Sequence, residues 1–267
     1  MIDLDAYFAR IGYAGDRQPS LPTLRAIHAL HPAAIPFENL DPLLGRPVAL
    51  DLESVQHKLV RQQRGGYCFE HNALLRSALQ ALGFRVTGLA GRVLWMAPPD
   101  RPLGARTHML LQIDLAGEAW IADVGFGGLL QDAPLRLAAD IEQTTSFETM
   151  RYVRSGDAYT LQAKLPGGWL DIYMFTLDPQ VDADYMVGNW FTSTHPASRF
   201  RSSLMVERLL PDIRISLNNL KLTHRHRNGS VTRRLLATPA ELERVLVDDI
   251  GLRLPAPARD IFERLPG

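Results

Sequence analysis

Apolar residues recur every three to four positions through the first ninety residues, which is the spacing of an amphipathic helix. Capping residues such as Ser20 and Asp51 mark predicted starts, and Pro32 with Pro36 is expected to end the second helix. The predicted helices cover residues 3–10, 20–32, 51–63 and 68–82. We therefore expect a small helical bundle, with residues 35–41 as an irregular, apolar connector.

From Phe84 the period changes, because apolar residues now alternate with polar ones as in a strand with one buried face. Strands are predicted at residues 86–95, 107–115, 118–124, 149–153, 159–164 and 169–176. A loop rich in proline, residues 98–104, separates the first two, and Ala116-Gly117 forms a turn between the next two. Since short turns rather than helices connect these strands, an antiparallel barrel or sandwich is expected.

The last third of the chain has a mixed pattern. Strands are predicted at residues 201–206, 213–217, 221–226 and 230–235. Thr238, Pro239 and Glu241 then fit a capping box with proline at the first helical position, and this helix is expected to end before Gly251. The chain as a whole is therefore predicted to be α+β.

Composition narrows the class of protein. The 29 basic and 29 acidic side chains balance, so no net field favours nucleic acid or an anionic membrane. The N-terminus lacks the pattern of a signal peptide, and no apolar run approaches the roughly 20 residues that cross a bilayer. One cysteine cannot form an intrachain disulfide, which favours a reducing compartment. We expect a cytoplasmic protein without a nucleic-acid or membrane partner.

That single cysteine, Cys68, stands where two predicted helices meet. Gly65-Gly66 breaks the first helix, and the second begins at about Cys68. A thiol at a helix start lies at the positive end of the helix dipole, which favours the thiolate. A lone cysteine can equally be a small buried apolar residue, so other residues must show whether Cys68 is a nucleophile.

The predicted hairpin brings a histidine and an aspartate together. If Ala116-Gly117 is a two-residue turn, residue i pairs with residue 233 − i, which sets His108 opposite Gly125. Asp123 then lies on the same face, diagonal to His108 and about 7–8 Å away at the backbone. If this hairpin meets the Cys68 helix, a thiol, a base and an orienting carboxylate form a Cys-His-Asp triad.

Five segments, read together, resemble the signature blocks of the arylamine N-acetyltransferases. They are Pro36–Asn39, Arg64–Asn72, Thr107–Leu111, Ala122–Gly127 and Asn189–Phe200. The blocks follow the order and spacing of that family over roughly two-thirds of the chain, and the nine residues around Cys68 are the most specific match. After Phe200 the signatures are weaker.

The resemblance implies a fold and a triad. It implies a helical bundle over residues 1–86 that carries Cys68, a β-barrel over 87–195 that carries His108 and Asp123, and an α/β lid over 196–267. The triad would be arranged as in cysteine proteases. Glu38 and Arg64 both fall in signature blocks, and we expect them to pair and brace the nucleophile loop.

The resemblance also implies an activity. The family transfers acetyl from acetyl-CoA, used as a cosubstrate without a metal, to the nitrogen of arylamines, arylhydrazines or N-hydroxyarylamines. The implied mechanism is ping-pong through S-acetyl-Cys68.

Further site residues follow from the same blocks. By resemblance the acceptor pocket is lined by Phe37, Phe126 and Phe200. Groups that could contact CoA or the acetyl oxygen are Thr107, Gly125, Gly127 and Gly128. Core packing and a tight turn are the alternative explanations for the phenylalanines and the glycines.

Other functions stay open at this point. A thiol hydrolase or a transglutaminase-like enzyme would use the same triad, and a non-catalytic binding module could keep the fold. A dinucleotide or P-loop enzyme is disfavoured, since no Gly-rich fingerprint opens a βαβ unit. His224 and His226 are a weak metal signal without further ligands, and a solvated strand face explains them better.

Overall fold

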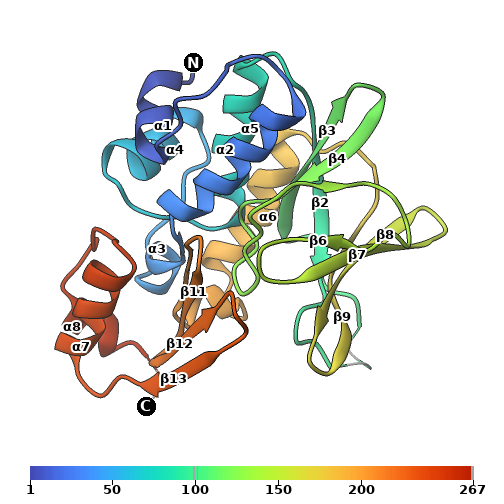
Figure 1. Ribbon diagram of the computed structural model, residues 1–267. Coiled ribbons are helices and arrows are strands. Elements are labelled where there is room, and N and C mark those ends of the chain that lie inside the picture. The colour runs from blue at the N-terminus through green and yellow to red at the C-terminus, as the bar shows by residue number, and fades with distance from the viewer. Residues whose placement is uncertain (99, 101, 266–267) are drawn as a thin grey trace.

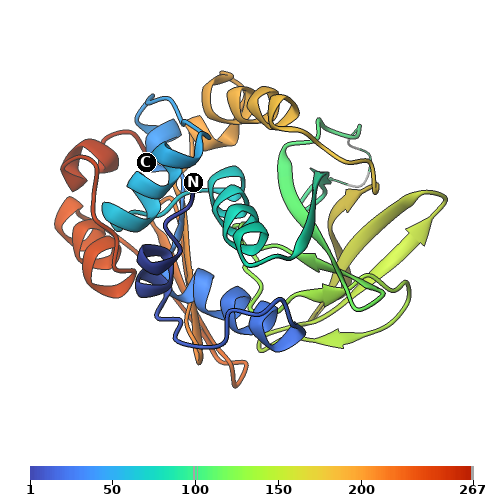
Figure 2. The same ribbon diagram turned by 90° about the horizontal axis from the view of Figure 1, so that it is seen from above.

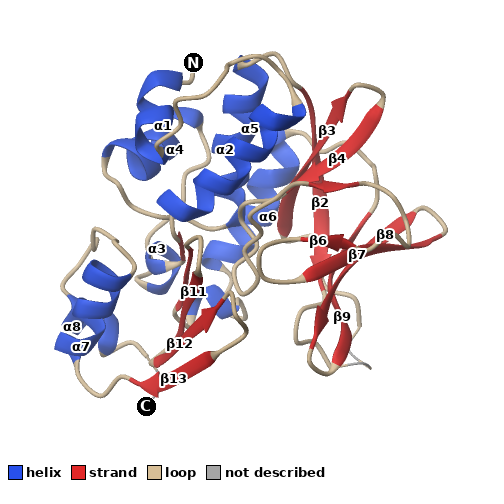
Figure 3. Ribbon diagram, in the orientation of Figure 1, coloured by secondary structure: helices blue, strands red, loops and turns tan. Residues whose placement is uncertain are grey.

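The computed structural model describes residues 1–98, 100 and 102–265 of the chain, so residues 99 and 101 of the predicted proline-rich loop lie outside the described residues. Helices from the first part of the chain form one block of the molecule, and an antiparallel sheet stands beside them (Figure 1). A second sheet with the last two helices lies below the first block (Figure 1). Coloured by secondary structure, the molecule shows helices and antiparallel strands in separate groups, which confirms the predicted α+β class (Figure 3).

The N-terminal helices begin where the capping residues predict. They are α1 (Leu4–Ile11), α2 (Leu21–Ala34), α3 (Leu40–Leu43), α4 (Leu52–Gln56), the π-helical η1 (His57–Arg61) and α5 (Cys68–Ala81). The side chains of Asp3, Ser20 and Asp51 each accept a hydrogen bond from a backbone N–H in the first turn.

Of the two prolines predicted to end α2, only Pro36 does so. The helix continues to Ala34, because Pro32 lies in the last turn, where its missing N–H removes one hydrogen bond and the N–H of Ile35 still bonds to the carbonyl of His31. Pro36 ends the helix instead, since the residue before a proline is driven to extended geometry.

The larger sheet has eight strands in the order β5-β4-β3-β2-β9-β8-β7-β6, all antiparallel neighbours. Its strands are β2 (Arg85–Val93), β3 (His108–Leu115), β4 (Glu118–Ala122), β5 (Leu135–Arg136), β6 (Gln143–Thr144), β7 (Thr149–Ser155), β8 (Ala158–Leu165) and β9 (Gly168–Phe175). Six of these were predicted. The strands β5 and β6 were missed because two residues are too few to show an alternation.

The smaller sheet has the order β1-β10-β11-β12-β13. Its strands are β1 (Phe37–Glu38), β10 (Met205–Leu209), β11 (Ile213–Asn218), β12 (Lys221–His226) and β13 (Val231–Leu235). Two expectations are corrected here. The connector 35–41 contains β1 and the start of α3, and the strand predicted at 201–206 begins only at Met205, after the 3-10 turn η2 (Arg199–Arg201).

Three helices complete the chain: α6 (Asp182–Thr194), α7 (Pro239–Arg244), which continues as η3 (Val245–Asp249), and α8 (Ala258–Phe262). Thr238 caps α7 as predicted. The helix α6 was not predicted, because it exposes Met186, Val187 and Trp190 while it buries polar residues such as Asn189. Such a helix lacks the usual apolar inner face.

The helices and the larger sheet share a core that runs between α5 and the strands β2, β3 and β4. Seen from above, α5 lies between the sheet and the remaining N-terminal helices (Figure 2). The division at residues 86 and 195 stays a prediction. The strand β1 lies before the first boundary, yet it pairs with β10 beyond the second, Phe37 opposite Glu207.

Candidate active site

Cys68 is the first residue of α5 and is 4% exposed. Its Sγ donates to the carbonyl oxygen of Thr107 at 3.6 Å. The loop after β4 packs directly on this turn, because a Cβ atom built on Gly125 would lie 2.7 Å from the Cα of Cys68. The helix start and the hairpin therefore meet, as the triad prediction required.

The hairpin has the register that the sequence predicts. Leu115 pairs with Glu118 and Leu111 with Ala122, so the pairing rule of 233 − i holds along the ladder. Ala116 and Gly117 both have positive φ, at 52° and 82°, as a two-residue hairpin turn requires. His108 Nε2 lies 2.6 Å from Asp123 Oδ2, which confirms the predicted contact.

This pair is buried and ionised. Burial alone would lower the pKa of His108, but the adjacent Asp123 carboxylate and the Cys68 thiol raise it to about 10. Burial would raise the pKa of Asp123, and His108 together with the hydrogen bonds from Asn72 and Gly125 holds it below its usual range. Because Nε2 faces Asp123, the other ring nitrogen of His108 is left for the thiol.

Two residues that the sequence analysis did not single out hold Asp123. Asn72 Nδ2 donates to Asp123 Oδ1 at 3.0 Å and to the Met109 carbonyl at 2.7 Å. His28 Nε2 accepts from the Asp123 N–H at 3.1 Å. Asn72 closes the block around Cys68 and lies one turn further along the same helix face, a spacing that could have identified it. His28 carries no comparable signal.

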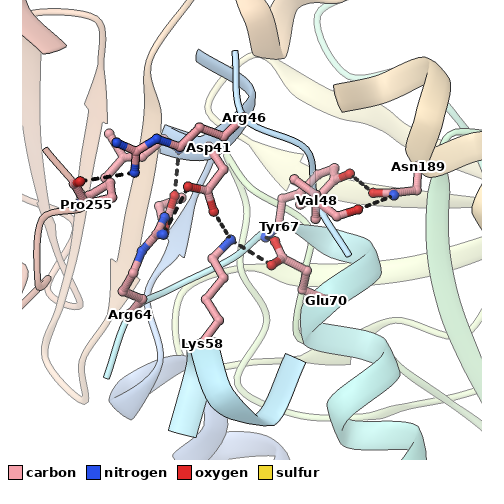
Figure 4. Close-up of polar contacts among 11 residues, drawn as sticks. Asp41, Arg46, Val48, Lys58, Arg64, Tyr67, Glu70, Asn189 and Pro255 are labelled. Carbon is pink, nitrogen blue, oxygen red and sulfur yellow. Dashed lines mark hydrogen bonds and ion pairs between the residues drawn. The ribbon is translucent and has the colours of Figure 1, made fainter. Parts of the chain in front are cut away.

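A buried chain of ion pairs alternating in sign joins residues on both sides of Cys68 in the sequence, and Figure 4 shows its members Arg64, Asp41, Lys58 and Glu70. Its members are Glu38, Arg64, Asp41, Lys58 and Glu70, with neighbours 2.8, 3.0, 2.8 and 2.7 Å apart in that order. The predicted pair of Glu38 and Arg64 is therefore present. Glu70 continues the chain to the backbone N–H of Tyr67 at 3.1 Å, and the Tyr67 hydroxyl donates to Asn189.

The three predicted pocket residues do not form one group. Phe37 and Phe200 contact each other edge to face, with ring centroids 6.3 Å apart. Phe126 packs against His108 instead, with centroids 5.1 Å apart. Tyr173, which the sequence analysis missed, lies 4.8 Å from the His108 ring. The structure thus places Phe126 and Tyr173 beside His108 and pairs Phe37 with Phe200, and the role of the three phenylalanines as pocket walls stays a prediction.

The predicted CoA contacts have other partners in the structure. The Gly125 N–H donates to Asp123 Oδ1, and the Gly128 N–H to Glu207 Oε2. Gly127 lies so close to the Phe37 ring that a side chain would collide with it. The Thr107 carbonyl accepts from the thiol. Close packing explains the glycines, and binding of CoA by these residues stays a prediction.

The smaller sheet contacts the loop that follows β4 through Glu207, a residue that the sequence analysis missed. Its carboxylate accepts from the backbone N–H groups of Gly128 and Leu130, each at 2.9 Å. Arg214 lies 3.4 Å from Glu207 and also binds Glu148. The residues beyond 196 therefore hold the loop that carries Phe126.

Within the described part of the chain, no three histidine, cysteine, aspartate or glutamate side chains gather in a way that could hold a metal ion. His224 and His226 lie on β12 without such a group. No helix among residues 1–98, 100 and 102–265 is long and apolar enough to cross a bilayer.

Comparison with known proteins identifies the family. A family profile described as N-acetyltransferase matches residues 20–259. The arylamine N-acetyltransferase of Mycolicibacterium smegmatis is 43% identical over 268 residues, covering 99% of this chain and 97% of that protein. A Salmonella typhimurium relative, named arylamine N-acetyltransferase / N-hydroxyarylamine O-acetyltransferase, is 40% identical over 93% of this chain and 88% of its own length.

Solved structures agree with these relatives. The Mycobacterium marinum arylamine N-acetyltransferase in complex with CoA superposes with a TM-score of 0.91 at 42% identity, covering 98% of this chain and 96% of that chain. A second structure of the Mycobacterium marinum arylamine N-acetyltransferase superposes with a TM-score of 0.94 at 40% identity, covering 98% of this chain and 99% of that chain. Fold, sequence and signature blocks converge: the chain belongs to the arylamine N-acetyltransferase family and is an acyltransferase.

Proposed function

We propose that this enzyme transfers an acetyl group from acetyl-CoA to arylamines, arylhydrazines or N-hydroxyarylamines through S-acetyl-Cys68. The observation that carries the proposal is the buried His108–Asp123 pair, 2.6 Å apart, beside a thiol at the start of α5. The CoA complex of the Mycobacterium marinum relative supports the donor. The Salmonella relative's name supports the hydroxyl oxygen as the acceptor atom of N-hydroxyarylamines, in addition to amine nitrogen.

In the first half-reaction the Cys68 thiolate attacks the thioester carbonyl of acetyl-CoA. A bond forms between Cys68 Sγ and the acetyl carbon, and the bond from that carbon to the CoA sulfur breaks. His108, charged and held by Asp123, gives its proton to the departing sulfur. The products are S-acetyl-Cys68 and free CoA, with His108 now neutral.

In the second half-reaction the acceptor attacks the acetyl carbon of S-acetyl-Cys68. His108 takes the proton from the attacking nitrogen or oxygen, the carbon–sulfur bond breaks, and Cys68 leaves as a thiolate. The thiolate and the charged His108 are thereby restored. Burial of Cys68 at 4% exposure limits access of water, which would otherwise hydrolyse the intermediate.

The remaining predictions belong to the same proposal. Phe37, Phe126 and Phe200 would face a flat aromatic acceptor, and residues 107 and 125–128 would lie near the CoA thiol end. Residues 196–267 would act as a lid. This role is supported by the hydrogen bonds that Glu207 accepts from the backbone N–H groups of Gly128 and Leu130. A cytoplasmic location remains a prediction from composition.

Intact mass after brief mixing with acetyl-CoA, without an amine, tests this function. We expect the protein to gain one acetyl group, the Cys68→Ser variant to gain none, and an added arylamine to remove it. An acetyl group that leaves equally fast without amine would favour a thiol hydrolase. No gain with any short acyl-CoA would contradict the proposal.

A further inference from the structure

Glu207 joins two parts of the site through two kinds of contact. It lies on β10, where its backbone pairs with that of Phe37 on β1. Its carboxylate accepts from the backbone N–H groups of Gly128 and Leu130, in the loop that follows β4, each at 2.9 Å. Directly opposed residues of antiparallel strands have their side chains on one face, so the Phe37 ring lies on the face from which Glu207 contacts this loop. One residue therefore links β1 to the loop that carries Phe126.

The loop itself packs on the Phe37 ring. A Cβ atom built on Gly127 would collide with that ring, so only glycine allows backbone and ring to approach this closely. The preceding loop residue, Phe126, packs on His108 with ring centroids 5.1 Å apart. The bonds of Glu207 to the backbone just after Gly127 thus determine how far the loop stands from Phe37.

The two ends of this loop are held by different groups. At its start, the side chains of Asn72 and Asp123 accept from the backbone N–H groups of residues 124 and 125, at 3.2 and 3.0 Å. These bonds belong to the triad and its support and do not involve the smaller sheet. Glu207 holds residues 128–130 instead. Loss of its contacts would therefore free the later part of the loop while the bonds that hold Asp123 remain.

The surroundings of Glu207 are buried and polar. Glu207 is 2% exposed, and Arg214 lies 3.4 Å from its carboxylate. Burial raises the pKa of Glu207, and Arg214 together with the two loop N–H groups opposes that rise. Arg214 also donates to the carboxylate of Glu148 at 2.9 Å and to the carbonyl oxygen of Leu130 at 2.8 Å. Because Arg214 keeps these partners when Glu207 is changed, a substitution of Glu207 acts first on the loop.

We propose that Glu207 is a positioning residue for the acceptor: its carboxylate holds the loop after β4 against Phe37, and so fixes the spacing between Phe37 and Phe126 as walls for an aromatic acceptor. The inference rests on the proposed function, which assigns these two phenylalanines to the acceptor. A side chain of the smaller sheet thereby determines how broad an acceptor reaches S-acetyl-Cys68.

The test compares two acceptors on preformed S-acetyl-Cys68. The acetyl-enzyme is prepared with acetyl-CoA, freed of excess donor, and mixed with either aniline or 2-aminofluorene, which are a single-ring and a fused three-ring arylamine. Intact mass follows the loss of the acetyl group. The readout is the ratio of the rate constant with 2-aminofluorene to that with aniline. This ratio excludes the donor half-reaction, and it is insensitive to a loss of folded protein because both rate constants fall together.

Glu207→Gln keeps the size of the side chain but leaves one oxygen for two N–H donors, so the loop loses one of its two bonds. We expect the ratio to rise by about three- to tenfold, because a loosened wall admits the broader ring system; one misfitting methylene group in an apolar pocket costs about 10- to 200-fold. Glu118→Gln is the matched control, since Glu118 forms an exposed ion pair with Arg136 at the start of β4. The control should keep the ratio of the unchanged protein.

Glu207→Asp separates reach from charge. It keeps the negative charge beside Arg214 but shortens the side chain by one methylene group, and the loop cannot follow because Gly127 already packs on the Phe37 ring. The ratio should therefore rise as in Glu207→Gln. Gly127→Ala pushes the loop away from Phe37 without changing Glu207, so it should shift the ratio in the same direction even if the Glu207 variants do not fold. Circular dichroism checks the fold of each variant.

Three results would overturn the inference: a ratio in Glu207→Gln that equals or falls below that of Glu118→Gln, an unchanged ratio in Glu207→Asp, or an unchanged ratio in Gly127→Ala. The first would leave Glu207 a structural role only, and the second would assign its effect to the charge beside Arg214. The proposed function fails differently, when the unchanged protein gains no acetyl group from acetyl-CoA or neither arylamine removes it. An acceptor role for Glu207 would then fall with it, whereas normal acetylation and discharge with a constant ratio would contradict the role of Glu207 alone.

Discussion

Four buried histidines belong to the helical bundle and the hairpin that meet at Cys68, and their pKa values shift in opposite directions in these two parts. His28, His31 and His71 belong to the helical bundle, and His108 belongs to the β3–β4 hairpin; none is more than 2% exposed. Burial lowers the pKa of His28 and of His71 to about 4, and that of His31 well below its usual value. On the hairpin side, the pKa of His108 rises to about 10.

Burial makes the charged form of His31 and His71 unfavourable, and no carboxylate among the described residues bonds to either ring to offset it. His71 Nε2 must donate to the carbonyl oxygen of Pro36 at 3.2 Å, so its Nδ1 accepts from His31 Nε2 at 2.9 Å. His31 Nδ1 in turn accepts from the Tyr7 hydroxyl at 2.8 Å. The rings of His31 and His71 are each satisfied by one donor and one acceptor, and a second proton on either would break this chain of hydrogen bonds.

Among these four equally buried rings, only His108 bonds directly to a carboxylate of the described part of the chain, and only its pKa is raised. A carboxylate beside His108 outweighs the cost of burying its positive charge, while hydroxyl, carbonyl and imidazole partners in the bundle do not. The hairpin side is thus suited to proton transfer, and the bundle side to holding the Cys68 loop in place.

The largest effect is expected from Asp123→Asn, because this change should leave His108 neutral, like the histidines of the helical bundle. Without the carboxylate, His108 loses its charge and its fixed orientation, so acetylation of Cys68 should fall by about three to four orders of magnitude. Quenched-flow intact mass would measure this, with circular dichroism as the check on folding. Near-normal acetylation of a folded Asp123→Asn protein would break the triad assignment.

Gly125→Ala tests the contact where hairpin and bundle meet. Its Cβ atom would lie 2.7 Å from the Cα of Cys68, and backbone atoms cannot move away as a flexible side chain would. We expect acetylation to slow by roughly 10- to 100-fold, since a small misplacement of reacting groups costs about that much. Gly104→Ala is the control, because nothing lies within 4 Å of its added Cβ. Equal rates in the two variants would refute the close contact.

His71→Phe should affect stability more than chemistry. The change removes the hydrogen bonds to Pro36 and His31 and leaves their buried groups without partners, which costs about 1–3 kcal/mol for each group. The free energy of unfolding, from urea denaturation at pH 7, should fall by about 2–4 kcal/mol, while the folded fraction keeps most of its acetylation rate. A rate loss as large as that of Asp123→Asn would show that the bundle histidines take part in proton transfer.

The smallest expected effect is a difference in pH dependence. The folded pKa of His71 lies below that of an unfolded histidine, about 6.5, so the unfolded state binds more protons between about pH 6.5 and pH 4. Stability is therefore present above pH 6.5 and is lost as the pH falls through this window. The raised pKa of His108 acts in the opposite sense: its contribution is present below pH 6.5 and is lost as the pH rises toward 10.

Urea denaturation at pH 7, 6 and 5 measures this dependence. Each neutral histidine should contribute up to about 1.4 kcal/mol per pH unit to the acid loss. His71→Phe should therefore show a slope that is shallower by about that amount. An unchanged slope would mean that His71 is not held neutral in the folded protein.

Much of the local structure follows from the sequence. The caps Ser20, Asp51 and Thr238, the start of α5 at Cys68 and the two-residue turn at Ala116-Gly117 were all predicted, because each depends on a few neighbouring residues. The hairpin register then placed His108 against Asp123 without any tertiary information. The signature blocks added the family, which the comparisons confirm.

Tertiary structure decided what depends on partners distant in sequence. The strand β1 exists because β10 pairs with it, the support of Asp123 by His28 joins residues 95 positions apart, and Glu207 holds Gly128 from another sheet. The charge of each buried histidine was equally hidden, since His71 and His108 look alike in sequence and differ in their folded neighbours. Short-range patterns set caps, turns and register, whereas burial and long-range contacts set which groups are charged and how Cys68 is held.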